Sequence, residues 1–272
     1  MTAPADTDFP APAFDTSAPH PARVYDYLLG GKDNYAADRA AGERLVKADP
    51  QAAASARANR KFLGRAVRYL AGQQGIRQFL DIGTGIPTAG NTHQVAQAVA
   101  PRSRVFYVDN DPIVLAHARA LLISSEAGAT DYLQADLRQP LKVLHAAAQL
   151  LDFSQPVALL LVAILHFIPD ADNPARLLAA YRGALAPGSY LVISHGTGDF
   201  HPPEAAKAAT EVYSRGPSSL TPRRKEDIVP FFGDFALEEP GLVQAPAWRP
   251  DAEPAPDAMR GIGLYAGVAR NK

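Results

Sequence analysis

Short apolar runs alternate with amphipathic helical stretches from Gly75 to about residue 195, and this alternation is the strongest constraint on the fold. The runs that predict strands are 78–82, 105–109, 132–134, 157–162 and 190–195. The helical stretches fall between them, at 92–99, 113–122, 141–151 and 174–185. Such alternation is typical of a parallel sheet with helices on both faces. The unbroken apolar run from Val157 to Leu165 indicates a strand buried on both sides, as in a doubly wound α/β sheet.

The segments before this alternation differ in composition. Residues 1–21 carry five prolines and predict a flexible arm. Residues 22–75 contain three helical stretches, which predict an N-terminal helical cap, and residues 76–272 form the predicted main domain. Cap and main domain together, residues 22–272, are expected to be one globular unit.

The chain after residue 195 no longer alternates regularly. We expect helices at 203–215 and 222–232, strands at 235–237 and 264–269, and a proline-rich, acidic linker at 238–260. The insertion at 200–232 is the natural place for the walls of a substrate site. Its basic residues are candidates for binding a carboxylate, although charged runs more often form solvated faces: Arg215, Arg223, Arg224 and Lys225.

Composition excludes several classes of function. Lysine and arginine number 27 against 28 aspartate and glutamate, so the net charge of −1 predicts neither a nucleic-acid partner nor an anionic membrane partner. With no cysteine, the chain has no disulfide framework, no thiolate metal site and no cysteine nucleophile. The seven histidines form no i, i+4 pair, and we predict no metal site. Neither a signal peptide nor a membrane span is predicted, so we expect a cytoplasmic location.

The segment FLDIGTGIPTAGN, residues 79–91, predicts a ligand site at the end of the first strand. Asp81 precedes the turn Gly83-Thr84-Gly85, whose glycines let the backbone come close to a ligand. A dinucleotide fingerprint would have a third glycine where Thr88 stands. The Asp81 carboxylate would also repel a pyrophosphate, whereas it would stabilise the ammonium and sulfonium of S-adenosylmethionine. The turn therefore favours S-adenosylmethionine over NAD.

Acidic residues also follow the next two strands. Asp109 and Asn110 end the second strand, where a carboxylate suits the ribose hydroxyls of any unphosphorylated adenosine. Asp111 precedes Pro112 and predicts a helix N-cap. Asp136 and Leu137 follow the third strand. Two interpretations of Asp136 stay equally open: an acceptor for the adenine amino group, or a turn residue.

Five segments together resemble one known family: ARVYDYLLGGKDNYAADR (22–39), RQFLDIGTGIPTAGNTHQVAQ (77–97), VFYVDNDPIVLAHARALL (105–122), LHFIPD (165–170) and PGSYLVISH (187–195). The chain resembles class I S-adenosylmethionine-dependent methyltransferases of a family long catalogued as a domain of unknown function. The resemblance implies a Rossmann-like sheet of seven strands with the last strand antiparallel. It also implies cofactor binding by Asp81, Gly83, Gly85, Asp109 and Asp136, and supplies no substrate.

The N-terminal segment of that resemblance crowds polar and aromatic groups around Gly30-Gly31. One interpretation is core packing by the tyrosines and a helix C-cap at the glycines. The interpretation we favour is a lid over the cofactor, because a cap alone needs fewer polar groups. The residues expected to contact the cofactor are Tyr27, Gly31, Lys32 and Asn34. Deleting residues 1–35 is then expected to weaken cofactor binding strongly.

Methyl transfer from a sulfonium is a displacement in which the protein aligns the reactants and excludes water. His166 follows the fourth strand at the ligand edge and is the first candidate for a general base or substrate contact, against a purely structural hydrogen-bonding role. His195, after the fifth strand, is the second candidate, and His93 is expected to cap a helix or support the site from behind. The acceptor is expected to be an oxygen or nitrogen atom of a small molecule.

Three alternatives remain beside this hypothesis. An NAD-dependent oxidoreductase is disfavoured by Asp81 and Thr88. A nucleic-acid or protein methyltransferase is disfavoured by the charge balance and by the lack of an Asn-Pro-Pro-Tyr-type segment after the fourth strand. A non-catalytic S-adenosylmethionine-binding regulator stays open, because the same residues hold the cofactor in an enzyme and in a binder.

Overall fold

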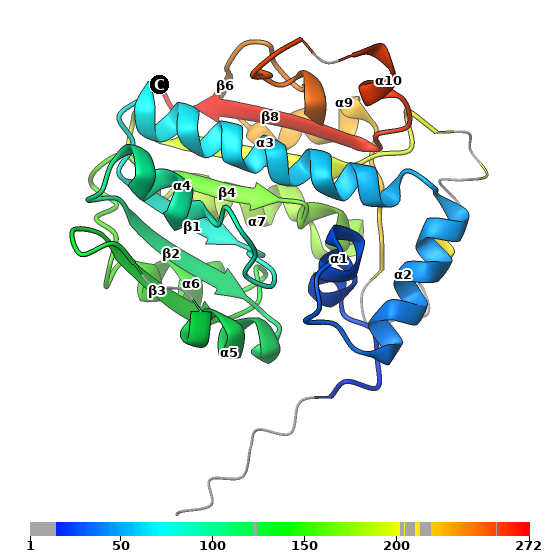
Figure 1. Ribbon diagram of the computed structural model, residues 1–272. Helices are drawn as coiled ribbons and strands as arrows, with labels where there is room; N and C mark the ends of the chain where they lie inside the picture. The colour runs from blue at the N-terminus through cyan, green and yellow to red at the C-terminus, as the bar shows by residue number, and fades with distance from the viewer. Residues whose placement is uncertain (1–14, 122–123, 202–203, 205–209, 213–218, 254) are drawn as a thin grey trace, which may run out of the picture.

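The computed structural model describes residues 15–121, 124–201, 204, 210–212, 219–253 and 255–272 (Figure 1). Five parallel strands form the centre of the sheet: β1 (Gln78–Ile82), β2 (Arg104–Asp109), β3 (Ala129–Gln134), β4 (Ala158–Val162) and β5 (Tyr190–Gly196). Antiparallel pairing adds three more: β6 (Ala236–Leu237), β7 (Val243–Gln244) and β8 (Leu264–Arg270). The strand order is β3-β2-β1-β4-β5-β8-β6, with β7 paired to β8 beside this path.

This topology confirms the predicted Rossmann-like mixed sheet, with the last strand antiparallel. The strand order reverses between β1 and β4, and in doubly wound sheets ligands bind at that switch point. The sheet has eight strands rather than the seven predicted, because the two-residue strand β7 also pairs with β8. A strand that short carries no periodic signal in the sequence.

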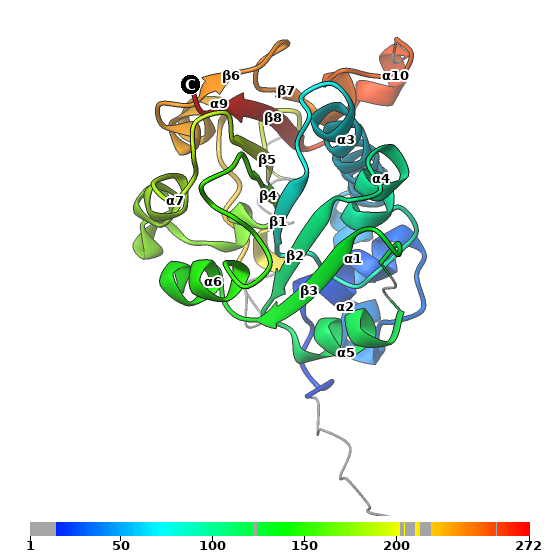
Figure 2. The ribbon, with the colours of Figure 1, turned by 90° about the vertical axis from the view of Figure 1, so that its left-hand side faces the viewer.

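Helices cover both faces of the sheet (Figure 2). One face packs against α6 (Pro140–Ala147), α7 (Pro174–Arg182) and α9 (Lys225–Ile228). The other packs against α3 (Ala52–Gly72) and α4 (Thr92–Val99), while α5 (Pro112–Leu121) packs on β2 and β3. Along β4, Leu159 and Leu161 join the first core and Ala158 and Leu160 the second. Both sides of β4 are therefore buried, which explains its unbroken apolar sequence.

Three N-terminal helices form the cap: α1 (Pro21–Leu29), α2 (Ala36–Ala48) and the first half of α3. His20 caps α1, Pro21 stands in its first turn, and Gly30 ends it with φ of +81°. A small core of its own holds these helices together and includes Val24, Leu28 and Leu45. The second half of α3 packs on the sheet through Phe62 and Val67, so one long helix connects the cap to the main domain (Figure 1).

The C-terminal third departs from the predictions in two places. The helix predicted at 222–232 is split into α9 and a 3-10 turn, Val229–Phe232, because Pro230 cannot continue an α-helix. The predicted linker at 238–260 contains β7, the 3-10 turn Ala245–Ala247 and the short helix α10 (Pro256–Met259). It also contains Trp248, which is fully buried against Phe62. Most of the predicted helix 203–215 lies outside the described residues.

None of the helices in the described part of the chain combines the length and the apolar character needed to cross a bilayer.

Candidate active site

A cavity of about 370 Å³ opens at the carboxyl edge of the sheet, between the strand ends and the cap helices. It lies beside the switch point of the strand order. Nine predicted site residues line it: Asp81, Gly83, Thr84, Gly85, Asp109, Asn110, Asp136, Leu137 and His166. The strand ends thus bring together residues that are up to 85 positions apart in the sequence.

Asp81 presents a buried carboxylate at the end of β1. Its side chain is 4% exposed, and its Oδ2 accepts a hydrogen bond of 2.6 Å from Thr92 Oγ1 at the start of α4. Burial raises the pKa of Asp81 to about 6, while the Thr92 hydroxyl and the Arg60 guanidinium oppose that shift. A buried carboxylate in this state gains stability when a cationic ligand group arrives beside it.

Asp109 shapes the glycine turn from the end of β2. Its Oδ2 accepts from the Gly85 N–H at 2.9 Å and its Oδ1 from the Asp111 N–H at 2.9 Å. Burial raises the pKa of Asp109, whereas these two backbone donors lower it. Asp111 Oδ1 in turn accepts from the Ile113 N–H at 2.9 Å, which confirms Asp111 as the cap of α5.

Asp136 lies at the end of β3 with its carboxylate bound to Arg138. Asp136 Oδ2 is 2.6 Å from Arg138 Nη2, and Oδ1 accepts from the Arg138 backbone N–H at 2.8 Å. Hydrogen bonds from Arg138 hold the pKa of Asp136 below its usual range. Asp136 therefore closes a turn and lines the cavity at the same time, so both interpretations from the sequence stay open.

Helix α1 lines the cavity through Pro21, Ala22, Tyr25 and Leu28 and not through Tyr27, and the segment after α1 does not line it. Tyr27 packs over Gly42 of α2. In the segment after α1, Asp26 accepts from Asn34 Nδ2 at 2.8 Å and lies against Gly31, so these groups build the turn itself. Tyr27, Gly31, Lys32 and Asn34 do not line the cavity, and their contacts with the cofactor stay a prediction. Lys32 is exposed.

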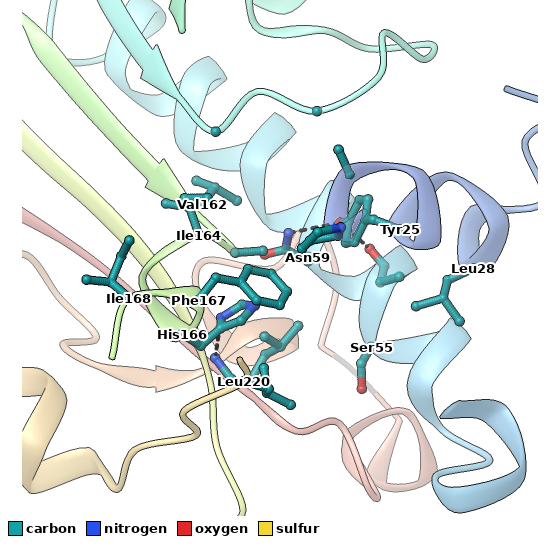
Figure 3. Close-up of a pocket in the computed structure, with 18 of the residues that line it drawn as sticks. Tyr25, Leu28, Ser55, Asn59, Val162, Ile164, His166, Phe167, Ile168 and Leu220 are labelled. Atoms are coloured by element: carbon teal, nitrogen blue, oxygen red, sulfur yellow. Dashed lines mark hydrogen bonds between the residues drawn. The ribbon is translucent and has the colours of Figure 1, made fainter. Parts of the chain in front are cut away.

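A chain of hydrogen bonds connects the cap to the sheet beside the cavity; Figure 3 shows its first part, at Tyr25 and Asn59. Tyr25 Oη donates to the Ala56 carbonyl at 3.0 Å and accepts from Asn59 Nδ2 at 2.9 Å. Asn59 Oδ1 accepts from Ser194 Oγ at 2.6 Å, and Ser194 Oγ accepts from the Ala163 N–H at 2.9 Å. Asn59 is a residue of the site that was not predicted from the sequence. An asparagine three and four residues before Phe62 and Leu63, on the buried face of α3, was the available signal.

His166 lines the cavity and is hydrogen-bonded on one side. The Gly196 N–H donates to His166 Nδ1 at 3.0 Å, and the side chain is 7% exposed. Burial, followed by the nearby His195 and Arg223, holds the pKa of His166 well below its usual range. The ring is therefore neutral at physiological pH, and its proton is on Nε2, because Nδ1 must accept from a backbone donor.

His195 lies behind His166 and does not line the cavity. It is fully buried, its Nδ1 lies 2.7 Å from the Gly196 carbonyl, and its Nε2 lies 3.0 Å from Arg223 Nη1. A carbonyl only accepts and a guanidinium only donates, so both ring nitrogens are occupied. Burial lowers the pKa of His195 to about 3. This geometry supports a positioning role for His195 in place of the predicted catalytic role.

Arg223 also has a structural role, in place of the predicted binding of a substrate carboxylate. It is 7% exposed and donates to the carbonyls of Leu165 and Ile168 at 3.1 and 2.8 Å, on either side of His166. Its Nη2 also lies 2.6 Å from Asp170. Arg224 and Lys225 are exposed, and Arg215 lies outside the described residues. Histidine 93 supports the site from behind, since its backbone N–H donates to Tyr107 Oη at 2.8 Å.

One ion pair lies on the cavity wall. His201 Nε2, on the segment after β5, lies 3.5 Å from Asp49 Oδ2, just before α3. Asp49, as hydrogen-bond partner and as a charge, is the main reason why the pKa of His201 is raised, and the backbone of Gly261 contributes in the same direction. Across the described residues, no group of three or more histidine, aspartate or glutamate side chains is arranged to hold a metal ion.

Comparison with known proteins identifies the family. A family model described as S-adenosyl methyltransferase matches residues 8–272. The chain belongs to the S-adenosyl methyltransferase family. Two solved structures resemble this methyltransferase over almost their whole length: a DUF574 family protein from Streptomyces avermitilis (43% identity, TM-score 0.90, 95% of this chain and 99% of that one) and a candidate methyltransferase from Thermobifida fusca (44%, 0.89, 98% and 100%).

A more distant likeness concerns the fold alone. Human N-acetylserotonin methyltransferase, solved in complex with S-adenosylmethionine, has 17% identity and a TM-score of 0.50, covering 91% of this methyltransferase and 62% of its own chain. No protein of curated function matches the sequence. The predicted family, the methyltransferase activity and the cofactor S-adenosylmethionine are confirmed by the family model. An NAD-dependent oxidoreductase and a non-catalytic binder are set aside.

The cavity fits this cofactor chemically. Two buried carboxylates, Asp81 and Asp109, stand at neighbouring strand ends, and cationic and hydroxyl groups of a ligand would stabilise them. A Cβ atom built on Gly85, between them, meets no protein atom within 4 Å, so open space adjoins the turn where a ligand can approach.

Proposed function

We propose that this methyltransferase transfers a methyl group from S-adenosylmethionine to an oxygen or nitrogen atom of a small molecule bound in the cavity at the carboxyl edge of the sheet. The observation that carries the proposal is the pair of buried carboxylates beside an open glycine turn. A volume of about 370 Å³ falls in the range of small-molecule sites.

Each end of the cavity suits one part of the cofactor. Asp81 would hold the ammonium group, and Arg60, which also lines the cavity, would bind the carboxylate of the same amino-acid portion. Asp109 and Asn110 would bind the ribose hydroxyls. Asp136 and Leu137 would border the adenine, with Asp136 keeping its bond to Arg138.

The chemistry supplied by the bound cofactor is an electrophilic methyl group on a sulfonium. The protein contributes alignment and the removal of water. The cap supplies Tyr25 and Leu28 to the wall that faces the sheet, and the chain Tyr25–Asn59–Ser194 holds that wall in place. His166 is the polar side chain that we place next to the acceptor.

We further infer that the partner is neither nucleic acid nor membrane, since the net charge is −1. A cytoplasmic location would place the enzyme where its methyl donor is made.

Glycine 85 offers a test with a matched control. Gly85→Ala adds a methyl group at φ of +69° beside the proposed cofactor, and Gly75→Ala adds the same group at φ of +71°, also in open space but outside the cavity. Both variants carry the same backbone strain. We expect isothermal titration with S-adenosylhomocysteine to show at least tenfold weaker binding for Gly85→Ala and unchanged binding for Gly75→Ala. Equal affinities in the two variants would contradict the proposed site.

A further inference from the structure

The hydrogen bond between Gly196 and His166 restricts what His166 can do to a methyl acceptor. A neutral imidazole has one nitrogen with a lone pair and one with a hydrogen. Because the Gly196 N–H donates to Nδ1 at 3.0 Å, the lone pair is taken there and the hydrogen is on Nε2. The hydrogen bond found between the His166 ring and the described residues is the one at Nδ1, and the side chain lines the cavity, so Nε2 is left for a ligand there. His166 therefore offers a donor to the cavity and no free lone pair.

The environment behind His166 keeps that arrangement in place. Arg223 clamps the carbonyls on both sides of it and donates to His195 Nε2, while His195 Nδ1 donates to the Gly196 carbonyl. The same residue, Gly196, thus receives a hydrogen from His195 at its carbonyl and gives one to His166 at its nitrogen. Moving the His166 hydrogen to Nδ1 would place that N–H against the Gly196 N–H, with both groups buried. That loss of a buried hydrogen bond disfavours the other tautomer.

The other described titratable groups on the cavity wall are engaged elsewhere. His20, which also lines the cavity, has its Nδ1 3.2 Å from Asp111 Oδ2 and acts on Asp109, at the end assigned above to the ribose. Asp49 is paired with His201, whose two nitrogens face Asp49 and the backbone of Gly261. Tyr25 Oη is committed to Ala56 and Asn59, and burial raises the pKa of Tyr25 to about 12. The remaining carboxylates, Asp81, Asp109 and Asp136, are those assigned above to the cofactor.

The wall around His166 is apolar. Six apolar side chains from the cap, the end of β4 and the segments that follow line the cavity together with His166 (Figure 3): Leu28, Val162, Ile164, Phe167, Ile168 and Leu220. Such a wall suits an uncharged, hydrophobic molecular body. A charged ammonium or carboxylate placed there would lose its hydration without a matching partner.

The hydrogen on Nε2 also selects the acceptor atom. An unprotonated amine nitrogen has one lone pair, so it cannot accept from His166 and attack a methyl group at the same time. An ionised hydroxyl has three lone pairs and can do both. An aliphatic alcohol would need a base to ionise it, and the described groups considered above are engaged elsewhere. An acidic phenol or enol ionises in water without a base from the protein.

We propose that the acceptor is an acidic phenolic or enolic hydroxyl on an apolar molecule, methylated as its oxyanion while His166 donates its Nε2 hydrogen to that oxygen. The hydroxyl proton leaves to solvent before the transfer. The oxyanion then forms the O–C bond as the C–S bond of the sulfonium breaks, the electron pair of the C–S bond stays on sulfur, and the two opposite charges cancel. The proposal rests on the proposed function and adds the acceptor class and the role of His166.

The first test needs no turnover. Nitrogen-15 NMR of the histidine rings, in the protein saturated with S-adenosylhomocysteine and with His166→Asn for assignment, reports which ring nitrogen carries the hydrogen. We expect His166 to keep hydrogen on Nε2 and a bare Nδ1 from pH 6 to pH 9. A hydrogen on Nδ1, or protonation of the ring near neutral pH, would overturn the proposed role.

The second test compares acceptors that share an apolar body: 4-propylphenol, 4-propylaniline and 4-propylbenzoate, with dimedone as an acidic enol. Release of S-adenosylhomocysteine is expected with the phenol and the enol. Turnover of the aniline or the benzoate instead, or of none of the four by protein that binds S-adenosylhomocysteine, would overturn the acceptor class. Protein that does not bind S-adenosylhomocysteine would refute the proposed function itself, so the two failures are distinguishable.

The third test separates a donor from a base. In His166→Gln the side-chain amide can still donate near the position of Nε2, whereas in His166→Asn the shorter amide can accept from Gly196 but does not reach the acceptor. With the best substrate we expect kcat to fall less than about tenfold in His166→Gln and about a hundredfold in His166→Asn, typical of losing a donor to a developing charge. The pH profile of the wild type should shift with the acidity of the acceptor. Equal losses in both variants, with a profile independent of the acceptor, would show that His166 is a base.

Discussion

Replacing Asp81 by asparagine is expected to stabilise the ligand-free protein and to weaken cofactor binding. Burial raises the pKa of Asp81 from 3.8 to about 6, so above pH 6 the folded protein holds a carboxylate that would be easier to ionise in the unfolded chain. This difference corresponds to about 3 kcal/mol of lost stability at pH 7.5. The penalty is absent below pH 3.8, grows as pH rises from 3.8 to about 6, and is fully present above that. Asparagine at position 81 removes this ionisation penalty, and it weakens the hydrogen bond from Thr92 by about 1 kcal/mol.

The net expectation for Asp81→Asn is a gain of about 2 kcal/mol at pH 7.5 without ligand, or about 4–8 °C in Tm. At pH 4.5 the gain should vanish. The dissociation constant of S-adenosylmethionine should rise by about 30- to 1000-fold, because a buried charge pair is lost.

Thermal denaturation at both pH values, with and without S-adenosylmethionine, and isothermal titration together test this expectation. Asp131→Asn is the control, because Asp131 is exposed on β3 and no change is expected in either measurement. Two results would refute the reasoning: a lower Tm of ligand-free Asp81→Asn at pH 7.5, or an unchanged affinity for the cofactor.

Two further expectations concern the stability of residues that line the cavity. Ala163 has φ of +58°, so Ala163→Gly should stabilise the protein by about 1 kcal/mol in urea denaturation, whereas Ala179→Gly on the exposed face of α7 should destabilise it by a similar amount. Loss of stability in Ala163→Gly would contradict the strain argument. Because Asp49 raises the pKa of His201, their ion pair stabilises the cap fully below the unfolded pKa of about 6.5 and is lost as pH rises through the folded value. Asp49→Asn should therefore cost stability at pH 6 and little at pH 9; an equal cost at both would exclude the ion pair.

The sequence predicted the central elements well because their signals are local. β1 was predicted with its observed bounds, and the helix at 92–99 likewise, since buried strands and amphipathic helices each have their own periodicity. The segment at 238–260 was taken for a linker because its prolines and acidic residues hid Trp248, whose burial depends on Phe62 and Tyr69 far earlier in the chain. A short strand such as β7 depends on its partner β8 in the same way.

The residues of the candidate site show the same difference: some have a local signal in the sequence, and others depend on tertiary packing. Residues directly after strands, such as Asp81, Asp109 and His166, were predicted to meet because parallel strands end at one edge. The choice between Tyr25 and Tyr27 was not predictable. Two residues on a helix that are two positions apart point about 200° apart, and only the docking of α1 decides which one faces the cavity.

By itself, then, the order of the amino acids determined the layered α/β architecture, the edge at which a ligand binds, and the cationic cofactor that a carboxylate before the glycine turn prefers. These follow from short-range periodicity and from the charge carried by a few adjacent residues. Only the tertiary structure decided where the hydrogen of His166 lies, why His195 and Arg223 are supports, and how Asn59 connects the cap to β5. Those properties depend on hydrogen bonds between residues from 28 to 135 positions apart, and no local pattern encodes which donor will face which acceptor.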